Sequence, residues 1–395
     1  MSVLKFSQFS DPSLFHSIDP PRLRVFLDGY RDYLRSRDFK TPADAKFTDA
    51  HVGQLIGILN TATRDTPPDF LEGFFHANEL NNDKGMESLL STASKKGVAI
   101  PDGDLTPADL ALFLWMVQPG LVRRANCERI IHRFQSFQYY QNELGDAPPF
   151  SLPSDAVLKQ IRVALDTFNR DRHRGGGSDV WMYHFGDDVA FLLRHGRLIV
   201  RDEVMEGDTP RPDVRRSVGY DLVVYNRKTG EIRVRAELVG ERRFYCQLFG
   251  RYLFDDPGFF PPGELFDLSP IQELGEDIQT PAHVDGIARI RLVEIREVLL
   301  GDHTLTTTHR ADEVFPALKE HSKQITPTAR LLHARFRFWL TDGHETTVTI
   351  YSGNIIRHTR PVGVDAIHQW MIHHGIRVRN HAPNATATLA TLASH

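Results

Sequence analysis

Apolar residues recur at helical spacing through the first 146 residues of the chain. Asp19 precedes Pro20 and Pro21, which is the pattern of a helix N-cap followed by proline in the first turn. A further helix is predicted over residues 121–143. The apolar positions that support the first helix lie three or four residues apart: Leu23, Phe26, Leu27, Tyr30 and Leu34. This spacing predicts an all-α helical domain over residues 1–146.

After residue 154 the period changes from helical spacing to alternation. One more helix begins at Ser154 or Asp155, and strands are predicted over residues 189–193 and 198–200, joined by a turn at His195-Gly196. Residues 220–238 predict a hairpin with a strictly alternating second strand. One face of that strand carries Ile232, Val234, Ala236 and Leu238, and the other carries Glu231, Arg233, Arg235 and Glu237. Residues 154–256 are therefore predicted to form a helix plus a β-rich central domain.

The last third of the chain predicts a third domain over residues 264–395. Two alternating runs, residues 334–340 and 346–351, flank Asp342-Gly343, and Asp-Gly between such runs is a strong hairpin signal. A helix is predicted over residues 364–374. The fold class expected from the whole chain is α+β and multidomain, with an all-α N-terminal domain followed by β-rich α+β modules.

Composition narrows the expected location of the protein. Of the 395 residues, 41% are hydrophobic and 25% are charged, which is typical of a globular protein in water. No apolar run approaches the roughly 18 residues that span a bilayer. The two cysteines have no metal-binding or redox spacing, and the N-terminus has no signal pattern, so we expect a cytoplasmic protein without a membrane partner. The oligomeric state stays open.

The central hairpin and the helix after it resemble the core of PD-(D/E)xK nucleases. Asp221 matches the first metal ligand of that family and Glu237 the second, which implies a Mg²⁺ site and hydrolysis of nucleic acid. The family's lysine, which helps to activate the attacking water, is replaced by Val239. The resemblance therefore implies an inactive relative, or an active nuclease built on Asp221 and Glu237. The same residues also fit an ordinary hairpin whose glutamate and arginine rows pair across solvent, without any nuclease ancestry.

Arginine and aromatic residues predict a binding surface in the β-rich half. In the last hairpin, Arg335, Arg337 and Trp339 share one face, and a face of this kind can neutralise phosphates and stack bases. The helix 364–374 or another domain could equally cover that face. Arg233, Arg235 and Arg242 extend the predicted surface, and no metal or other cofactor is expected outside the nuclease hypothesis.

Three functional hypotheses follow from the sequence. The first is a non-catalytic binding protein that holds nucleic acid or a partner protein on the arginine and aromatic surface. Inactive nuclease-like modules are frequent in restriction and phage-defence proteins, so a bacterial defence or regulatory system is a possible setting. The second is a Mg²⁺-dependent PD-(D/E)xK-like nuclease, and the third is an adaptor or assembly subunit without nucleic-acid contact.

Overall fold

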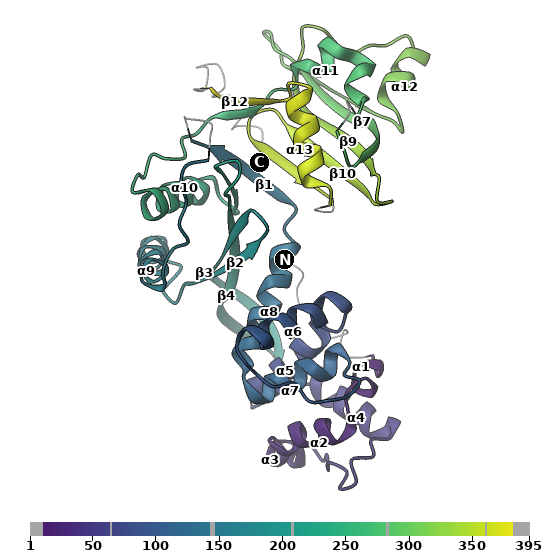
Figure 1. Ribbon diagram of the computed structural model, residues 1–395. Helices are drawn as coiled ribbons and strands as arrows, with labels where there is room; N and C mark the ends of the chain where they lie inside the picture. Colours follow the sequence, from purple (N-terminus) through teal and green to yellow (C-terminus); the bar gives the residue numbers. More distant parts are fainter. Residues whose placement is uncertain are drawn as a thin grey trace. The chain divides into compact units, whose positions relative to one another are not determined.

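A computed structural model describes residues 11–63, 65–142, 147–206, 209–281, 284–359 and 362–381 (Figure 1). The chain divides into two compact units between Arg133 and Phe134. Helices form the first unit, and a large antiparallel sheet with helices forms the second. The predicted fold class, an all-α N-terminal region followed by β-rich α+β structure, is confirmed.

The first unit is built from helices around an apolar core. Side-chain caps start several of them: Asp19 accepts a hydrogen bond from the backbone N of Arg22 at 3.2 Å, and Thr106 accepts one from Asp109 at 3.1 Å. Phe26, Phe70 and Phe74 pack against one another at the centre. The described helices are α1 Ser13–His16, α2 Pro20–Asp28, α3 Arg31–Ser36, α4 Asp49–Asn60, α5 Pro68–Glu79, α6 Asp83–Lys95, α7 Pro107–Val117 and α8 Pro119–His132.

A ten-stranded antiparallel sheet organises the second unit. Its strand order is β2-β3-β4-β5-β1-β11-β10-β9-β7-β8. A small second sheet pairs β12 with β6. The strands are β1 Ser136–Gln141, β2 Asp179–Phe185, β3 Asp188–Glu206, β4 Thr209–Asn226, β5 Glu231–Arg235, β6 Glu264–Phe266, β7 Ile287–Leu299, β8 Leu305–Arg310, β9 Arg330–Leu340, β10 Glu345–Tyr351, β11 Ile355–His358 and β12 Arg377–His381.

Helices cover the two halves of this sheet on opposite faces. Strand β1 joins the halves, and its neighbouring residues Tyr139 and Tyr140 belong to different apolar cores. Tyr140 packs with the core under α9 and α10, whereas Tyr139 packs with the core under α13. Successive strand residues point to opposite faces, so each half of the sheet has its own covered side. The helices of this unit are α9 Asp155–Asp171, α10 Val239–Phe254, α11 Ser269–Leu274, α12 Val314–Glu320 and α13 Val364–His373, with a 3₁₀ turn at Gly275–Gln279.

Two predictions of local structure are wrong. The helix predicted over residues 121–143 ends at His132, and residues 136–141 form the central strand β1. The apolar residues of this segment fit a strand as well as a helix, because one face of β1 is buried in one core and the other face in a second core. The turn predicted at His195-Gly196 does not occur, since β3 runs without a break from Asp188 to Glu206. A register shift between Gly196 and Ile199 replaces the turn.

The domain boundaries predicted from sequence differ from the division into two units. Residues 136–141, placed by prediction in the helical domain, belong to the sheet of the second unit. The further boundary between domains 154–256 and 264–395 stays a prediction, and one continuous sheet spans both sides of it. Residues 1–10, 143–146 and 382–395, where the predicted domains begin or end, lie outside the described residues. Among the described residues, no helix is both long and apolar enough to cross a membrane.

Candidate functional site

The last hairpin presents the predicted arginine face, and α13 does not cover it. Phe336 and Phe338 are fully buried and contact Trp370 of α13, with ring centroids 4.9 and 5.2 Å apart. The alternate residues of β9 therefore point to the other side of the sheet. The helix predicted over residues 364–374 packs on the apolar face and leaves Arg335 and Arg337 accessible.

Strand register places a row of polar side chains straight across this open face. Glu294 of β7 lies opposite Arg310 of β8 on one side and opposite Arg335 of β9 on the other. Thr349 of β10 lies opposite Arg335 and also opposite Arg357 of β11. Residues that lie opposite each other share a face, so the row crosses five neighbouring strands. Three of its five members are arginines.

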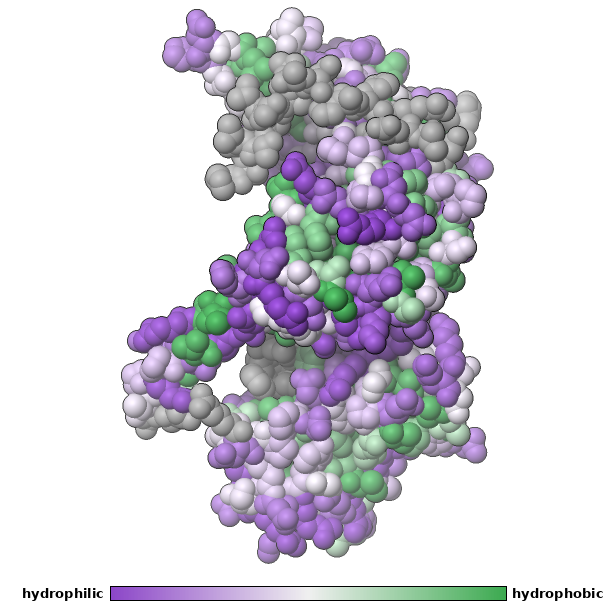
Figure 2. Space-filling view, turned by 90° about the vertical axis from the view of Figure 1, so that its left-hand side faces the viewer, coloured by the Kyte–Doolittle hydropathy of each residue, from purple (hydrophilic) through white to green (hydrophobic). Residues whose placement is uncertain are grey.

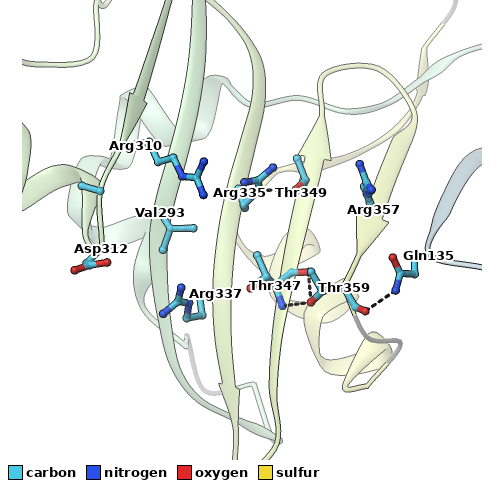
Figure 3. A pocket seen from close by; sticks show the side chains of 11 residues that line it. Gln135, Val293, Arg310, Asp312, Arg335, Arg337, Thr347, Thr349, Arg357 and Thr359 are labelled. Carbon is cyan, nitrogen blue, oxygen red and sulfur yellow. Dashed lines mark hydrogen bonds between the residues drawn. The ribbon is translucent and has the colours of Figure 1, made fainter.

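The three arginines and the threonine of this row form one side of an open pocket of about 730 Å³, whereas Glu294 is not part of its lining (Figure 3). A second row, Arg337 opposite Thr347, forms the other side. Figure 3 shows Arg335 between Arg310 on one side and Thr349 and Arg357 on the other. The full lining is Gln135, Val293, Arg310, Ala311, Asp312, Arg335, Arg337, Thr347, Thr349, Arg357 and Thr359. Four arginines face a single carboxylate in this lining, so the pocket favours anions.

Glutamates position three of the four guanidinium groups. Glu294 accepts a hydrogen bond from Nη1 of Arg335 at 2.9 Å, and its Oε2 lies 3.7 Å from Nε of Arg310. Nε of Arg337 lies 3.5 Å from Oε1 of Glu345. Within the described part of the chain, Arg357 is exposed and makes no ion pair or hydrogen bond through its side chain. The pocket thus combines three guanidinium groups paired with glutamates and one that has no ion-pair or hydrogen-bond partner among the described residues.

Trp339 extends the same face beyond the pocket. Its ring lies beneath the guanidinium groups of Arg289 and Arg291, at 4.6 and 5.5 Å, and that of Arg337, at 5.9 Å. The Trp339 ring therefore makes cation–π contacts with three neighbouring arginines. Flat guanidinium and indole surfaces of this kind can stack on bases.

The other three predicted arginines do not join this pocket. Arg233 pairs with Asp188 and lies 5.5 Å from the Phe137 ring, on the face opposite Arg335. Arg235 lies 5.9 Å from the Phe134 ring. Arg242 donates to the backbone oxygen of Ala236 at 3.1 Å and to Gln138 at 3.0 Å, so it ties α10 to the sheet. A continuous surface through all six predicted residues is not observed.

The two carboxylates of the nuclease resemblance lie in different environments. Asp221 is 4% exposed, accepts a hydrogen bond from the Tyr245 hydroxyl at 2.6 Å, and lies 3.0 Å from Nε2 of His195. Glu237 has a side chain that is 65% exposed and pairs with Arg197 at 3.2 Å. Across the described ranges, no group of three or more His, Cys, Asp or Glu residues is placed to hold a metal ion. Nothing in this geometry favours the nuclease hypothesis.

His195 and Asp221 form a charged pair in the interior. Nδ1 of His195 lies 2.9 Å from the backbone oxygen of Gly196, so both ring nitrogens face oxygen acceptors and both must donate. Burial alone would lower the pKa of His195, but the hydrogen bond and charge of Asp221 outweigh it and raise that pKa above its usual value. Burial and the charge of Asp221 raise the pKa of Tyr245 well above its usual value, so Tyr245 stays protonated and donates.

This pair predicts that stability depends on pH. The folded-state pKa of His195 is raised, so its stabilising contribution is complete below the unfolded value of about 6.5 and is lost as pH rises through the folded value. Urea unfolding of the wild type and of His195→Gln, from about pH 5.5 to about pH 9, measures the contribution. We expect the free energy of unfolding of the wild type to fall more steeply across this range. Parallel curves for the two proteins would contradict the assignment.

Sequence reasoning missed Arg310, Arg357 and Thr349. Thr349 could have been found, because the Asp342-Gly343 turn sets Thr347 and Thr349 opposite Arg337 and Arg335. Arg310 and Arg357 could not, since only the strand order brings β8 and β11 to this face.

No protein-family model matches this sequence, and no curated protein is significantly similar to it. The function is therefore inferred from the site itself.

Proposed function

We propose that the protein binds single-stranded nucleic acid on the open face of β8, β7, β9, β10 and β11. One observation carries the proposal: the guanidinium groups of Arg310, Arg335, Arg337 and Arg357 line a single pocket with only one carboxylate among the lining residues. Guanidinium groups bind phosphate oxygens through paired hydrogen bonds. The chain as a whole has a net charge of −4, so a local cluster of this kind contrasts with the rest of the surface.

The dimensions of the polar row fit a short stretch of one strand. Neighbouring strands lie about 4.8 Å apart, so the four steps from β8 to β11 span roughly 19 Å. That length suits about four nucleotides, at the small end of known single-strand sites. Arg335 lies midway between Arg310 and Arg357, which spaces three cations along the row.

Bases have flat partners next to the phosphate pocket. Trp339 and the arginines around it supply an indole ring and guanidinium planes on the same face. Stacking on such surfaces is tolerant of sequence, because every base has a π face. An open face also suits unpaired bases better than a duplex, whose bases are already stacked.

Removing two arginines of the pocket should weaken binding strongly. We expect Arg335→Ala/Arg337→Ala to reduce affinity for a fluorescein-labelled oligo(dT) at least about tenfold at low salt, through loss of two phosphate contacts. The slope of log affinity against log salt should fall in magnitude by about 1.4. Fluorescence anisotropy over a salt series measures both quantities.

A matched control removes two arginines from another part of the protein, so that the net charge changes by the same amount. Arg162 and Arg251 are exposed on α9 and α10, which pack on the other half of the sheet. Arg162→Ala/Arg251→Ala should bind oligo(dT) like the wild type. An equal loss of affinity in both double variants would mean that net charge alone explains the effect. Absence of salt-dependent binding by the wild type would favour an adaptor without nucleic-acid contact.

A further inference from the structure

The strands β3 and β4 continue as a two-stranded arm beyond the rest of the sheet. Strand β2 pairs with β3 only through Arg194, and β5 pairs with β4 only from Leu222 onward. Past the register shift, Ile199 to Glu206 pair with Arg216 to Thr209, and no third strand of the described chain pairs with them. An isolated two-stranded ribbon is marginally stable in water. Apolar and charged side chains alternate over the surface of this arm (Figure 2).

One face of the arm exposes several apolar side chains. Ile199, Met205 and Val214 are 59%, 65% and 64% exposed. Strand pairing puts them on the same face, here called the arm face, together with Pro210 and Pro212. The complete arm face is Ile199, Arg201, Glu203, Met205, Pro210, Pro212, Val214 and Arg216.

The opposite face of the arm pairs its charges internally. Arg215 lies 3.0 Å from Asp202 and 3.6 Å from Asp213. On the arm face, Arg201 and Glu203 are exposed, and neither makes an ion pair or hydrogen bond through its side chain with another described residue. The arm face thus has a cation and an anion at its centre, two residues apart, neither with a partner among the described residues, and a further exposed cation, Arg216, at one end.

These positions make the arm face complementary to itself. Consider a two-fold axis that lies in the plane of the contact, runs perpendicular to the strands and passes between Arg201 and Glu203. It brings the arm faces of two copies together so that their β3 segments lie on each other and run antiparallel. Arg201 then meets Glu203 of the second copy, and Ile199 meets Met205. On β4, Val214 meets Pro212. The two central charges each meet an opposite charge, the central apolar residues meet apolar ones, and each contact is made twice, as an isologous contact requires. At the end of the face, Arg216 meets Pro210 of the second copy.

Other ways of covering the arm fit less well. A two-fold axis along the strands sets Arg201 against Val214 and Glu203 against Pro212, which buries both charges without a partner. Addition of a strand to the outer edge of β4 is hindered, because Pro210 and Pro212 offer no N–H groups. Nucleic acid fits less well, because the carboxylate of Glu203 at the centre of the face would repel phosphate groups.

We propose that the protein forms a homodimer through the arm face, with the Arg201–Glu203 contact made twice across a two-fold axis. The contact is independent of the proposed nucleic-acid site, because the arm lies on strands β3 and β4 and the arginine pocket on β7 to β11.

Charge reversal distinguishes a second copy from any other occupant of the arm. R201E or E203R alone sets like charges against each other at both contacts, and each should weaken the dimer at least about tenfold. The double variant R201E/E203R restores opposite charges between identical chains, so it should dimerise like the wild type. Light scattering coupled to size-exclusion chromatography, over a dilution series, measures the dissociation constant.

Neighbouring apolar residues on the two faces provide the control. I199E changes the arm face and should give a monomer, whereas V200E changes the other face and should leave the dimer intact. All five variants alter exposed residues, and unchanged thermal unfolding of the monomer would show that they fold. A monomeric wild type, or a double variant that stays as weak as the single ones, would overturn the proposal.

Discussion

Replacing Asp221 by alanine is expected to lower the free energy of unfolding by about 3–5 kcal/mol. Asp221 is 4% exposed and accepts hydrogen bonds from Tyr245 and His195. Its removal leaves a buried histidine without its counter-ion and a buried hydroxyl without its acceptor, and both groups are costly in the interior. Urea unfolding followed by circular dichroism at neutral pH measures the change.

Glu237→Ala is the matched control for Asp221→Ala. The Glu237 side chain is 65% exposed, and its ion pair with Arg197 lies at the surface, so we expect a change within about 0.5 kcal/mol. The nuclease hypothesis predicts a different pattern: both variants would abolish cleavage of single-stranded DNA with Mg²⁺ or Mn²⁺, whatever their stability. Cleavage by the wild type that Glu237→Ala removes without unfolding the protein would reinstate that hypothesis.

Trp370→Ala should also destabilise the second unit by about 3–5 kcal/mol. Trp370 is fully buried between α13 and the sheet, where it contacts Phe336 and Phe338 and donates to the backbone oxygen of Thr280 at 3.1 Å. Alanine leaves a large cavity and an unsatisfied carbonyl group. Thermal unfolding monitored by near-ultraviolet circular dichroism follows the loss of this packing.

Ile372 offers a control on the same helix. Its side chain is 50% exposed, so Ile372→Ala should change the free energy of unfolding by no more than about 0.5 kcal/mol. Equal effects of Trp370→Ala and Ile372→Ala would mean that α13 contributes through its helical backbone and not through its buried face. The arginine pocket lies on the opposite side of the same strands, so nucleic-acid binding by Trp370→Ala should fail only where the protein unfolds.

Local sequence patterns predicted much of the structure but less of the candidate site. The helix start at Asp19 was found because a side-chain cap and proline act within one turn. Residues 136–141 were misassigned because both faces of β1 are buried, and a short run of this kind does not separate helix from strand. The strand through His195 was missed because glycine, read as a turn, here marks a register shift.

By itself, the sequence determined the fold class and the two-sided character of the last hairpin. Alternation puts Arg335 and Arg337 opposite Phe336 and Phe338 in any sheet, since strand side chains have a period of two. Tertiary structure alone decided which strands are neighbours, because pairing between distant segments depends on burying both cores at once and not on local propensity. That pairing places Arg310 and Arg357 in one row with Arg335, and it buries Asp221 while leaving Glu237 exposed.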